Sequence, residues 1–391
     1  MKPLQHLTIL DLSRVLACPF ASMILAELGA TVIKVEQPGA GDETRGFEPQ
    51  LAQDSAYYFA CNRSKSSITV NLRAPEGQDI IRELAQKVDV VVENFPAGTL
   101  GRYGLDFTML SALNPRLVYV SCTGFGQTGP YAHKKGYDTV FQAMGGLMSL
   151  TGEKGGGPVK PGLPVADLTS GLWVAIGILA MLAGREQSGR GAHLDFSMLD
   201  GQVSLLTLAA ARYFALGEVP PRLGTEHPGR VPSATFRCKD GKFAHITASD
   251  QHWDPLCKAL QLNFDIDLST NEARVENRDM VMLRLNEAIA EIERAKLLQM
   301  LDEVEVPIGP VNDVAEILSD PHVRARGLVG SFDYAGVGEF KALALPYKFL
   351  GWDNPAIGAP PALGADTATI LAEKLGYSKE KIASLKAAKA I

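Results

Sequence analysis

The sequence has few of the residues that build disulfide frameworks, metal sites or hydrolase centres. The five cysteines are Cys18, Cys61, Cys122, Cys238 and Cys257. None forms a C-x-x-C pair, so neither a disulfide scaffold nor a thiolate zinc site is indicated. The seven histidines show no metal-ligand spacing, and the Gly-x-Ser-x-Gly pattern is absent. We expect no bound metal, no serine-hydrolase triad and a reducing, cytoplasmic location.

Excess positive charge and long apolar runs are also missing. A net charge of -6 over 391 residues argues against a nucleic-acid or membrane partner. The most apolar run, residues 172–184, is too short to cross a bilayer and predicts a buried helix. The start, MKPLQHLTILDL, shows neither a signal peptide nor a transit pattern, so no export is expected.

The N-terminal half alternates between short β-rich runs and helical patterns. LTILDL, TVIKVE, VDVVVENF and PRLVYVSC are separated by segments such as CPFASMILAELGA, which predicts an α/β fold with a Rossmann-like parallel sheet. Residues 152–162 are rich in glycine and proline and predict a flexible loop. Composition shifts again near VPPRLGTEHPGRVPS, and the following FRCKDGKFAHIT predicts a hairpin that opens a smaller α/β domain.

One glycine motif suggests a dinucleotide at first sight. Residues 124–129 match G-x-G-x-x-G after a predicted strand, but PYAHKKGYD follows in place of an apolar helix. The first strand-to-helix turn, residues 13–18, contains no glycine. NAD or FAD binding is therefore not favoured.

Asp167 lies at the start of the long apolar helix in PVADLTSGLW. The simpler interpretation is an N-cap whose carboxylate accepts backbone N–H groups. The alternative is a nucleophile that the helix dipole keeps ionised. The residues alone leave both open.

Basic residues near the predicted strand ends offer a second set of candidates. They are suited to phosphate groups, although a solvated surface is the simpler interpretation. The six are Lys34, Arg45, Arg63, Lys65, Arg73 and Arg102.

The segment LDLSRVLACPFASMILAELGATVIKVEQPGAGDETR closely resembles the opening of class III (CaiB/BaiF-type) CoA-transferases. Further matching blocks are NRSKSSITVNLRAPEG, VVENFPAGTLGRYGL, GFGQTGPYAHKKGYD, PVADLTSGLW, VPIGPV and PPALGADT. In that family the aspartate of the A-D-x-x-x-G block is the nucleophile, which the resemblance places at Asp167. The resemblance implies exchange of CoA between acids through aspartyl anhydrides and an aspartyl-CoA thioester, with CoA and acyl-CoA as substrates and no tightly bound cofactor. It also raises the hypothesis that the glycines at 155–157 help to cover the site.

The family's CoA contacts carry over by matched position. They fall on Leu16, Gln37, Leu72, Arg73, Asn94, Phe95, Arg102, Lys135 and Tyr137. Gln37 departs from relatives that have a basic residue there, because its amide carries no charge. Asp366 departs as well, since relatives have histidine in the matching L-G-x-H-T pattern.

The resemblance also implies a domain organisation. Residues 1–200 are expected to form a large Rossmann-like CoA-binding domain, 201–224 a linker, 225–325 a small α/β domain, and 326–391 a return segment that completes the large domain. Two such subunits are expected to form an interlocked homodimer.

Three other activities stay open on this scaffold. An α-methylacyl-CoA racemase pairs the aspartate with a histidine, whereas Tyr137 stands there, and a phenol with a pKa near ~10 exchanges protons poorly at neutral pH. A non-catalytic acyl-CoA-binding protein is a further alternative. The formyl-CoA/oxalate branch has glutamine at the position of Leu16 and a glycine run in the small domain, where this sequence has none, so it is disfavoured.

The segment RLGTEHPGRVPSATF is more similar to the branch that uses succinyl-CoA and C4 to C6 dicarboxylates. The acceptors implied are hydroxymethylglutarate, itaconate, mesaconate or citramalate. His227 and Arg230 are candidates for the distal carboxylate, although a polar linker surface is the simpler interpretation.

Overall fold

A six-stranded parallel sheet organises the N-terminal half of the chain in the computed structural model, which describes residues 1–391. Its strands are β1 (Thr8–Asp11), β2 (Thr31–Glu36), β5 (Ser66–Thr69), β6 (Val90–Glu93), β7 (Val118–Thr123) and β8 (His193–Ser197). Their spatial order is β5-β2-β1-β6-β7-β8, with every neighbouring pair parallel. This is the Rossmann order, in which the chain reverses direction across the sheet between β1 and β6 and leaves a crevice at the carboxyl edge. The predicted parallel α/β sheet is confirmed.

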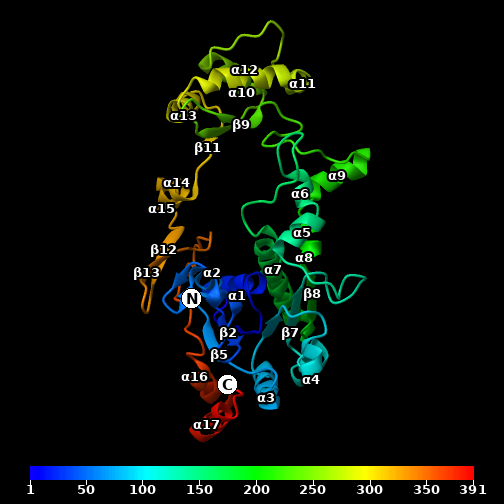
Figure 1. Cartoon of the computed structure of the whole chain (residues 1–391), viewed down its shortest axis with the longest axis vertical. Helices are drawn as coiled ribbons and strands as arrows, with labels where there is room; N and C mark the ends of the chain where they lie inside the picture. The colour runs from blue at the N-terminus through cyan, green and yellow to red at the C-terminus, as the bar shows by residue number, and fades with distance from the viewer. The chain divides into compact units, whose positions relative to one another are not determined.

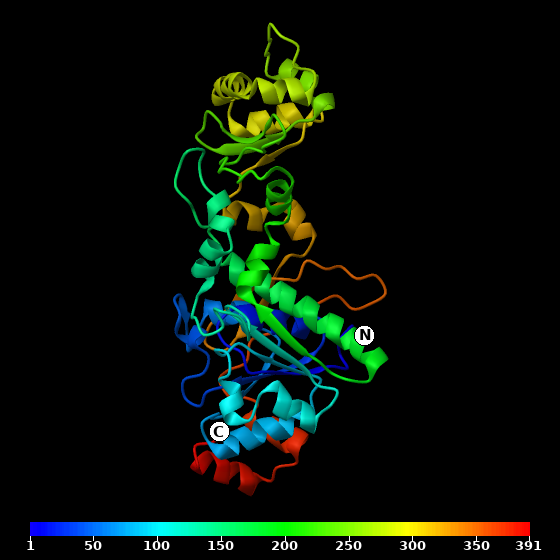
Figure 2. The same cartoon turned by 90° about the vertical axis from the view of Figure 1, so that its right-hand side faces the viewer.

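Helices cover both faces of this sheet (Figures 1 and 2). On one face lie α1 (Ala17–Glu27), α5 (Asp138–Met144) and α7 (Val165–Ser188). On the other lie α3 (Pro75–Ala85), α4 (Phe107–Leu113), α16 (Thr367–Leu375) and α17 (Lys379–Ala387). Successive strand side chains point to opposite faces, so Ile9 joins the first core and Leu10 the second. Strands buried on both faces explain the nearly continuous apolar runs of the sequence.

The chain also contains smaller elements outside this sheet. They are η1 (Glu43–Gly46), β3 (Gln50–Leu51), β4 (Asp54–Ser55), α2 (Ala56–Asn62), η2 (Leu100–Tyr103), α6 (Leu147–Leu150), α8 (Met198–Ser204), α9 (Thr207–Leu216), α15 (Pro321–Ala325), β12 (Val329–Tyr334) and β13 (Gly338–Leu343).

A second group of elements builds its own core around a three-stranded antiparallel sheet. Its strands are β9 (Ser233–Arg237), β10 (Phe243–Thr247) and β11 (Ile308–Pro310), in the order β11-β10-β9. Its helices are α10 (Asp250–Ala259), α11 (Asn271–Glu276), α12 (Arg278–Ala290), α13 (Arg294–Asp302) and α14 (Val314–Ser319). Strands β9 and β10 form the predicted hairpin, and Gly241 occupies its turn with a φ of 76°.

The chain divides into two compact units that each combine distant segments. The first contains residues 1–147, 161–211 and 322–391, and the second contains 148–160 and 212–321. These bounds differ from the expected ones at three places, one of which is that residues 322–325 belong to the first unit and not to the small domain. Residues 148–160 belong with the second unit, and the expected linker 201–224 is split between the two at residue 212.

Helix α7 is longer than the apolar run that predicted it. By length and composition alone it could cross a membrane, and 39% of its most apolar window is buried. Its buried face, which includes Val174 and Ile178, belongs to the core shared with α1 and the sheet. This packing is that of a core helix in a globular unit.

Candidate active site

The turn after β1 lies at the carboxyl edge, where the strand order reverses. The Asn94 side chain, which follows β6, accepts from Arg14 N at 2.9 Å and donates to Arg14 O at 2.7 Å. Val15 has a φ of 68°, and its N–H donates to the Asp42 carboxylate at 3.2 Å. A β-branched residue rarely adopts a positive φ, so these bonds hold a strained turn in place. Such turns concentrate where ligands bind.

Asp167 is the third residue of α7 and is partly buried. Its carboxylate has no hydrogen bond or ion pair, which leaves both oxygens available. The predicted N-cap role is therefore wrong, because the helix begins at Val165 and its cap is supplied from another element. Asp138, the first residue of α5, accepts from Ala166 N at 2.9 Å and Asp167 N at 3.3 Å.

The electrostatic surroundings of Asp167 also differ from the expectation. Burial and, as the smaller cause, the charge of Asp138 together raise the pKa of Asp167 to about 7. Without substrate, a large share of the Asp167 carboxyl groups is therefore protonated at neutral pH.

A buried glutamine fixes Asp138. The amide nitrogen of Gln142 donates to Asp138 Oδ2 at 2.6 Å, while Asp138 Oδ1 caps α7. Gln142 is fully buried, so this arrangement is rigid. Sequence reasoning missed both residues, although Asp138 directly follows Tyr137 in the GYD block that it used.

Gly171 explains the glycine of the A-D-x-x-x-G block. A Cβ at Gly171 would lie 2.7 Å from the Ala17 carbonyl oxygen and 2.9 Å from Phe20 Cδ1. The missing side chain lets the first turns of α7 approach the start of α1. Leu16 is the residue directly before α1.

The predicted CoA contacts lie at the carboxyl edge or in the segments beside it. Gln37 follows β2, Leu72 and Arg73 follow β5, and Asn94 and Phe95 follow β6. Arg102 lies in η2, whereas Lys135 and Tyr137 precede α5. The exposed members are Gln37, Arg73, Arg102, Lys135 and Tyr137. The structure joins Asn94 and Phe95 to the turn at Arg14, and it records no direct contact among the exposed members.

Four of the six basic residues proposed for phosphates are buried in ion pairs, so that proposal is wrong for them. The pairs are Lys34 with Asp42 (2.8 Å), Arg45 with Glu36 (2.7 Å), Arg63 with Glu27 (3.0 Å) and Lys65 with Asp11 (3.1 Å). A buried charge requires a partner, and each of these cations already has one. Arg73 and Arg102 are exposed at the same edge.

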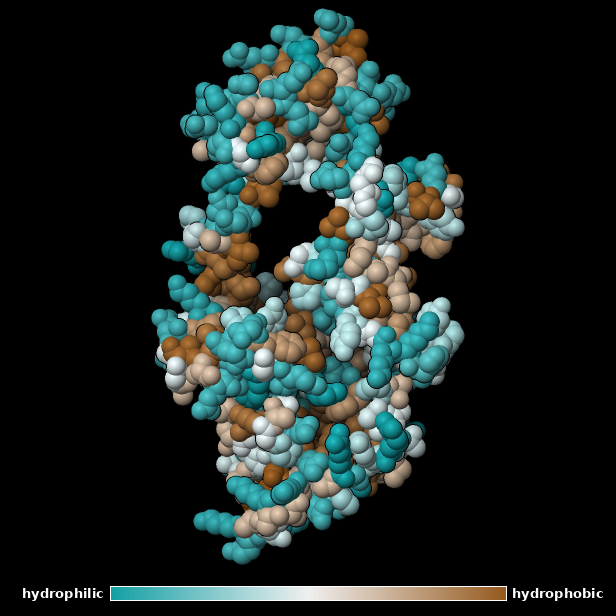
Figure 3. Space-filling model, viewed as in Figure 1, coloured by the Kyte–Doolittle hydropathy of each residue, from teal (hydrophilic) through white to brown (hydrophobic).

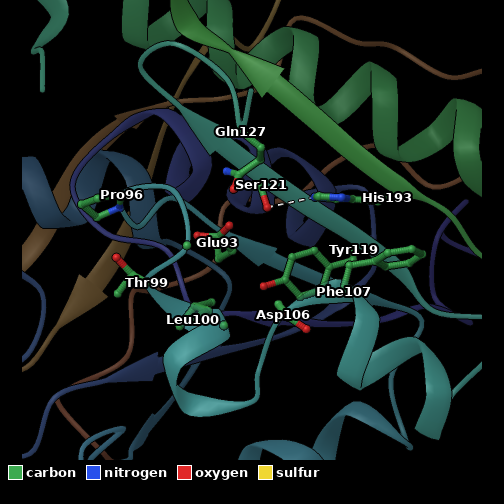
Figure 4. A pocket seen from close by; sticks show the side chains of 12 residues that line it. Glu93, Pro96, Thr99, Leu100, Asp106, Phe107, Tyr119, Ser121, Gln127 and His193 are labelled. Carbon is green, nitrogen blue, oxygen red and sulfur yellow. Dashed lines mark hydrogen bonds between the residues drawn. The ribbon is translucent and has the colours of Figure 1, made fainter. Parts of the chain in front are cut away.

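A cavity of about 160 Å³ opens beside the turn that carries Asn94 and Phe95 (Figure 4). Glu93 lies in its wall, and its Oε2 accepts from Phe95 N at 2.8 Å. Burial raises the pKa of Glu93 to about 7. Ser121 Oγ is 3.0 Å from His193 Nε2 in the same wall. No group of three or more His, Cys, Asp or Glu side chains is arranged to hold a metal ion.

The remaining predicted residues lie outside this edge. His227 and Arg230 belong to the second unit, where His227 Nδ1 accepts from Gly229 N at 3.1 Å and Arg230 is exposed. In the first unit, Asp366 Oδ2 accepts from Ser67 N at 2.8 Å, which secures the edge strand β5. The aspartate that replaces the family histidine therefore has a structural partner.

The glycine loop has an anchor that sequence reasoning missed. Arg222 donates to the Gly156 carbonyl oxygen from Nη2 at 2.7 Å and from Nε at 3.0 Å. Both residues belong to the second unit. The lid role stays a hypothesis about a loop that is tied to this arginine.

Comparison with known proteins places these features in one family context. The profile of "CoA-transferase family III" matches residues 4–367. The chain is 40% identical to succinyl-CoA:glutarate CoA-transferase of Mus musculus, with 98% of this chain and 89% of the relative covered. It is 37% identical to acetyl-CoA:oxalate CoA-transferase of Acetobacter aceti, with 90% of each covered. A crystal structure of a CAIB/BAIF family protein from Brucella suis superposes with a TM-score of 0.87 at 40% identity, covering 95% of this chain and 99% of that one.

Proposed function

The chain belongs to CoA-transferase family III, and we propose that it transfers CoA from succinyl-CoA to a small dicarboxylate with Asp167 as the nucleophile. The observation that carries the proposal is the unpaired, partly buried carboxylate of Asp167 beside the carboxyl edge of a Rossmann sheet. A nucleophile needs free oxygens, and no hydrogen bond or ion pair occupies those of Asp167.

The first half-reaction loads CoA onto the enzyme. An Asp167 oxygen attacks the thioester carbonyl of succinyl-CoA, the C–S bond breaks, and a mixed anhydride and CoA thiolate form. The thiolate then attacks the Asp167 carbonyl, which releases succinate and leaves an aspartyl-CoA thioester. No ATP is needed, because each step exchanges one activated acyl bond for another.

The second half-reaction repeats the chemistry in reverse order with the acceptor. A carboxylate of the acceptor attacks the aspartyl thioester, giving a second anhydride and CoA thiolate. Attack of the thiolate on the acceptor's acyl carbon yields the new acyl-CoA and free Asp167. Each attack develops an oxyanion, and the first backbone N–H groups of α1, which have no partner within the helix, are suited to stabilise it.

The residues at the carboxyl edge are proposed to bind CoA. Leu72 and Phe95 offer apolar surface, and Arg73, Arg102 and Lys135 offer exposed positive charge. Leu16, Gln37, Asn94 and Tyr137 complete the set. CoA is proposed to act as an exchangeable substrate, with no cofactor tightly bound, and the two units are proposed to act as a large CoA-binding domain and a smaller domain.

Glutarate joins the proposed acceptors because the mouse relative acts on it by name. It was not among the acids inferred from the sequence, although it falls within the C4 to C6 dicarboxylates. His227 and Arg230 are proposed to receive the distal carboxylate. Oxalate is the competing acceptor, favoured by the Acetobacter relative and disfavoured by Leu16.

A homodimer is supported by apolar helix surfaces that the single chain leaves uncovered. Helix α9 has no buried residue, and its Leu208 and Phe214 are 84% and 82% exposed. Figure 3 shows brown, hydrophobic side chains at the surface in the place where Figure 1 labels α9. Helix α7 exposes Trp173 and Ile176 on the face turned away from its core. A second copy of the chain is the proposed occupant, in the interlocked form implied by the family, and the cytoplasm is the proposed compartment.

Transfer assays test the function. Purified protein with succinyl-CoA is offered glutarate, mesaconate, itaconate, citramalate, hydroxymethylglutarate and oxalate, and new acyl-CoA is measured by mass spectrometry. We expect transfer to at least one C4 to C6 dicarboxylate and its loss in Asp167→Asn. Epimerisation of a 2-methylacyl-CoA would favour a racemase, and CoA binding without transfer to any acid would favour a binding protein.

A further inference from the structure

Arg14 is an exposed cation at the point where the sheet order reverses. Its side chain is 43% exposed, and its Cζ lies 4.9 Å from the centre of the Phe95 ring. Both backbone polar groups of Arg14 are bonded to the Asn94 side chain. Two residues proposed to bind CoA thus contact Arg14, Asn94 at its backbone and Phe95 at its guanidinium.

The guanidinium of Arg14 has unused donor capacity. Nη1 donates to Glu43 at 2.6 Å, whereas Nη2 and the buried Nε have no hydrogen-bond partner. The Glu43 side chain is itself 48% exposed, so this ion pair is open to solvent and is weak. It leaves a guanidinium that an anion can engage without breaking a buried contact.

The surroundings favour a phosphate as that anion. Lys34, Arg45 and Lys65 near the same edge are committed to buried carboxylates. The planar guanidinium group matches the geometry of phosphate oxygens. Because Asn94 and the Phe95 ring already restrict Arg14, the arginine loses less conformational entropy when it binds a ligand. The crevice where the strand order reverses is also where nucleotides bind in such sheets.

We propose that Arg14 is a CoA-binding residue whose guanidinium engages a phosphate group of the CoA nucleotide and exchanges Glu43 for it. This inference rests on the proposed function, because it assumes that CoA occupies the carboxyl edge. In this inference Glu43 competes with the CoA phosphate, because it binds the Arg14 guanidinium while no CoA is bound.

The test is calorimetric measurement of CoA dissociation constants at about 0.05 M and about 1 M salt. Arg14→Gln is expected to weaken CoA binding by about 10- to 100-fold at low salt, with a smaller difference at high salt. Arg14→Lys keeps the charge without the fork and is expected to lose less. Glu43→Gln is expected to tighten binding by about two- to fivefold. The matched control is Arg116→Gln, because Arg116 is an equally exposed arginine paired with Glu186 and lies at the opposite edge of the sheet.

A second readout separates phosphate contact from a structural role. For Arg14→Gln, kcat/KM is expected to fall with succinyl-CoA and to hold with succinyl-pantetheine, which lacks the nucleotide phosphates. An equal loss with both donors, or a CoA dissociation constant unchanged at low salt, would overturn the inference. If the wild-type protein transfers CoA to no acceptor, the proposed function fails; if it transfers CoA and Arg14→Gln binds CoA normally, only the role of Arg14 fails.

Discussion

At the scale of single residues, Asp138 adds to the effect of burial on the ionisation of Asp167, the proposed nucleophile. Only ionised Asp167 attacks, so activity is expected to rise as pH increases through the pKa of about 7. Asp138→Asn removes the like charge and moves this rise to lower pH. A shift of one unit would raise the ionised fraction at pH 6 about fivefold.

The measurement is kcat against pH for the two proteins. In Asp138→Asn, the side-chain amide oxygen can still accept from the first N–H groups of α7. The side-chain amide nitrogen can donate to Gln142 Oε1 once the Gln142 amide rotates, because Oε1 has no partner. The fold should therefore survive. An unchanged pH profile in a stable variant would show that Asp138 does not influence Asp167.

A second prediction at this scale concerns the close packing of Gly171. Gly171→Ala drives a methyl group against the Ala17 carbonyl, so we expect a loss of about 1–3 kcal/mol in unfolding free energy and a lower kcat. Gly184→Ala is the control in the same helix, because nothing lies within 4 Å of its Cβ position. That change should add about 0.5–1 kcal/mol. Equal effects in urea unfolding would contradict the packing argument.

The A-D-x-x-x-G block singles out Asp167 as the proposed nucleophile, but the surroundings of Asp167 could not be predicted from the sequence. The cap from Asp138 joins residues 29 positions apart in the chain, and it exists only because α5 packs on α7. Lys34 and Lys65 were misread for a similar reason. Their charges suggest a surface, whereas the carboxylates that bury them come from other strands and loops.

At the scale of elements, the loop 148–160 depends on Arg222. Arg222→Ala removes both hydrogen bonds to the Gly156 carbonyl, so the free energy of local opening is expected to fall by about 1–2 kcal/mol. Hydrogen exchange of amides in this loop, such as Val159 N, should then become about 5- to 30-fold faster. Arg212→Ala is the control, since Arg212 is bonded only to Glu218. Unchanged hydrogen exchange in Arg222→Ala would show that the loop 148–160 does not depend on these two hydrogen bonds.

The centre of the parallel sheet was predictable because β1, β2, β6 and β7 are largely buried and stand out as apolar runs, whereas β5 and β8 at its two edges are less apolar and were not predicted. Helix α7 was predicted too short, because Val165 and Ala166 begin it without a capping side chain of their own. The placement of 148–160 with the second unit was not predictable, since it follows from Arg222, more than 60 residues later in the chain.

At the scale of the whole molecule, uncovered apolar helices predict self-association. The double change Leu208→Glu and Phe214→Glu places charges on α9 and is expected to convert dimers to monomers or to prevent stable folding. Light scattering coupled to gel filtration gives the mass. Leu350→Glu is the control, because Leu350 is 97% exposed outside these helices. A wild-type protein that is monomeric in solution would contradict the proposed homodimer.

The central claim is that Asp167 becomes covalently bonded to CoA. The most direct measurement is mass spectrometry of the protein after incubation with succinyl-CoA, with and without hydroxylamine, for wild type and Asp167→Ala. We predict a CoA adduct on the peptide that contains Asp167, its conversion to a hydroxamate by hydroxylamine, and neither product in the variant. A folded Asp167→Ala protein that still transfers CoA would contradict the account.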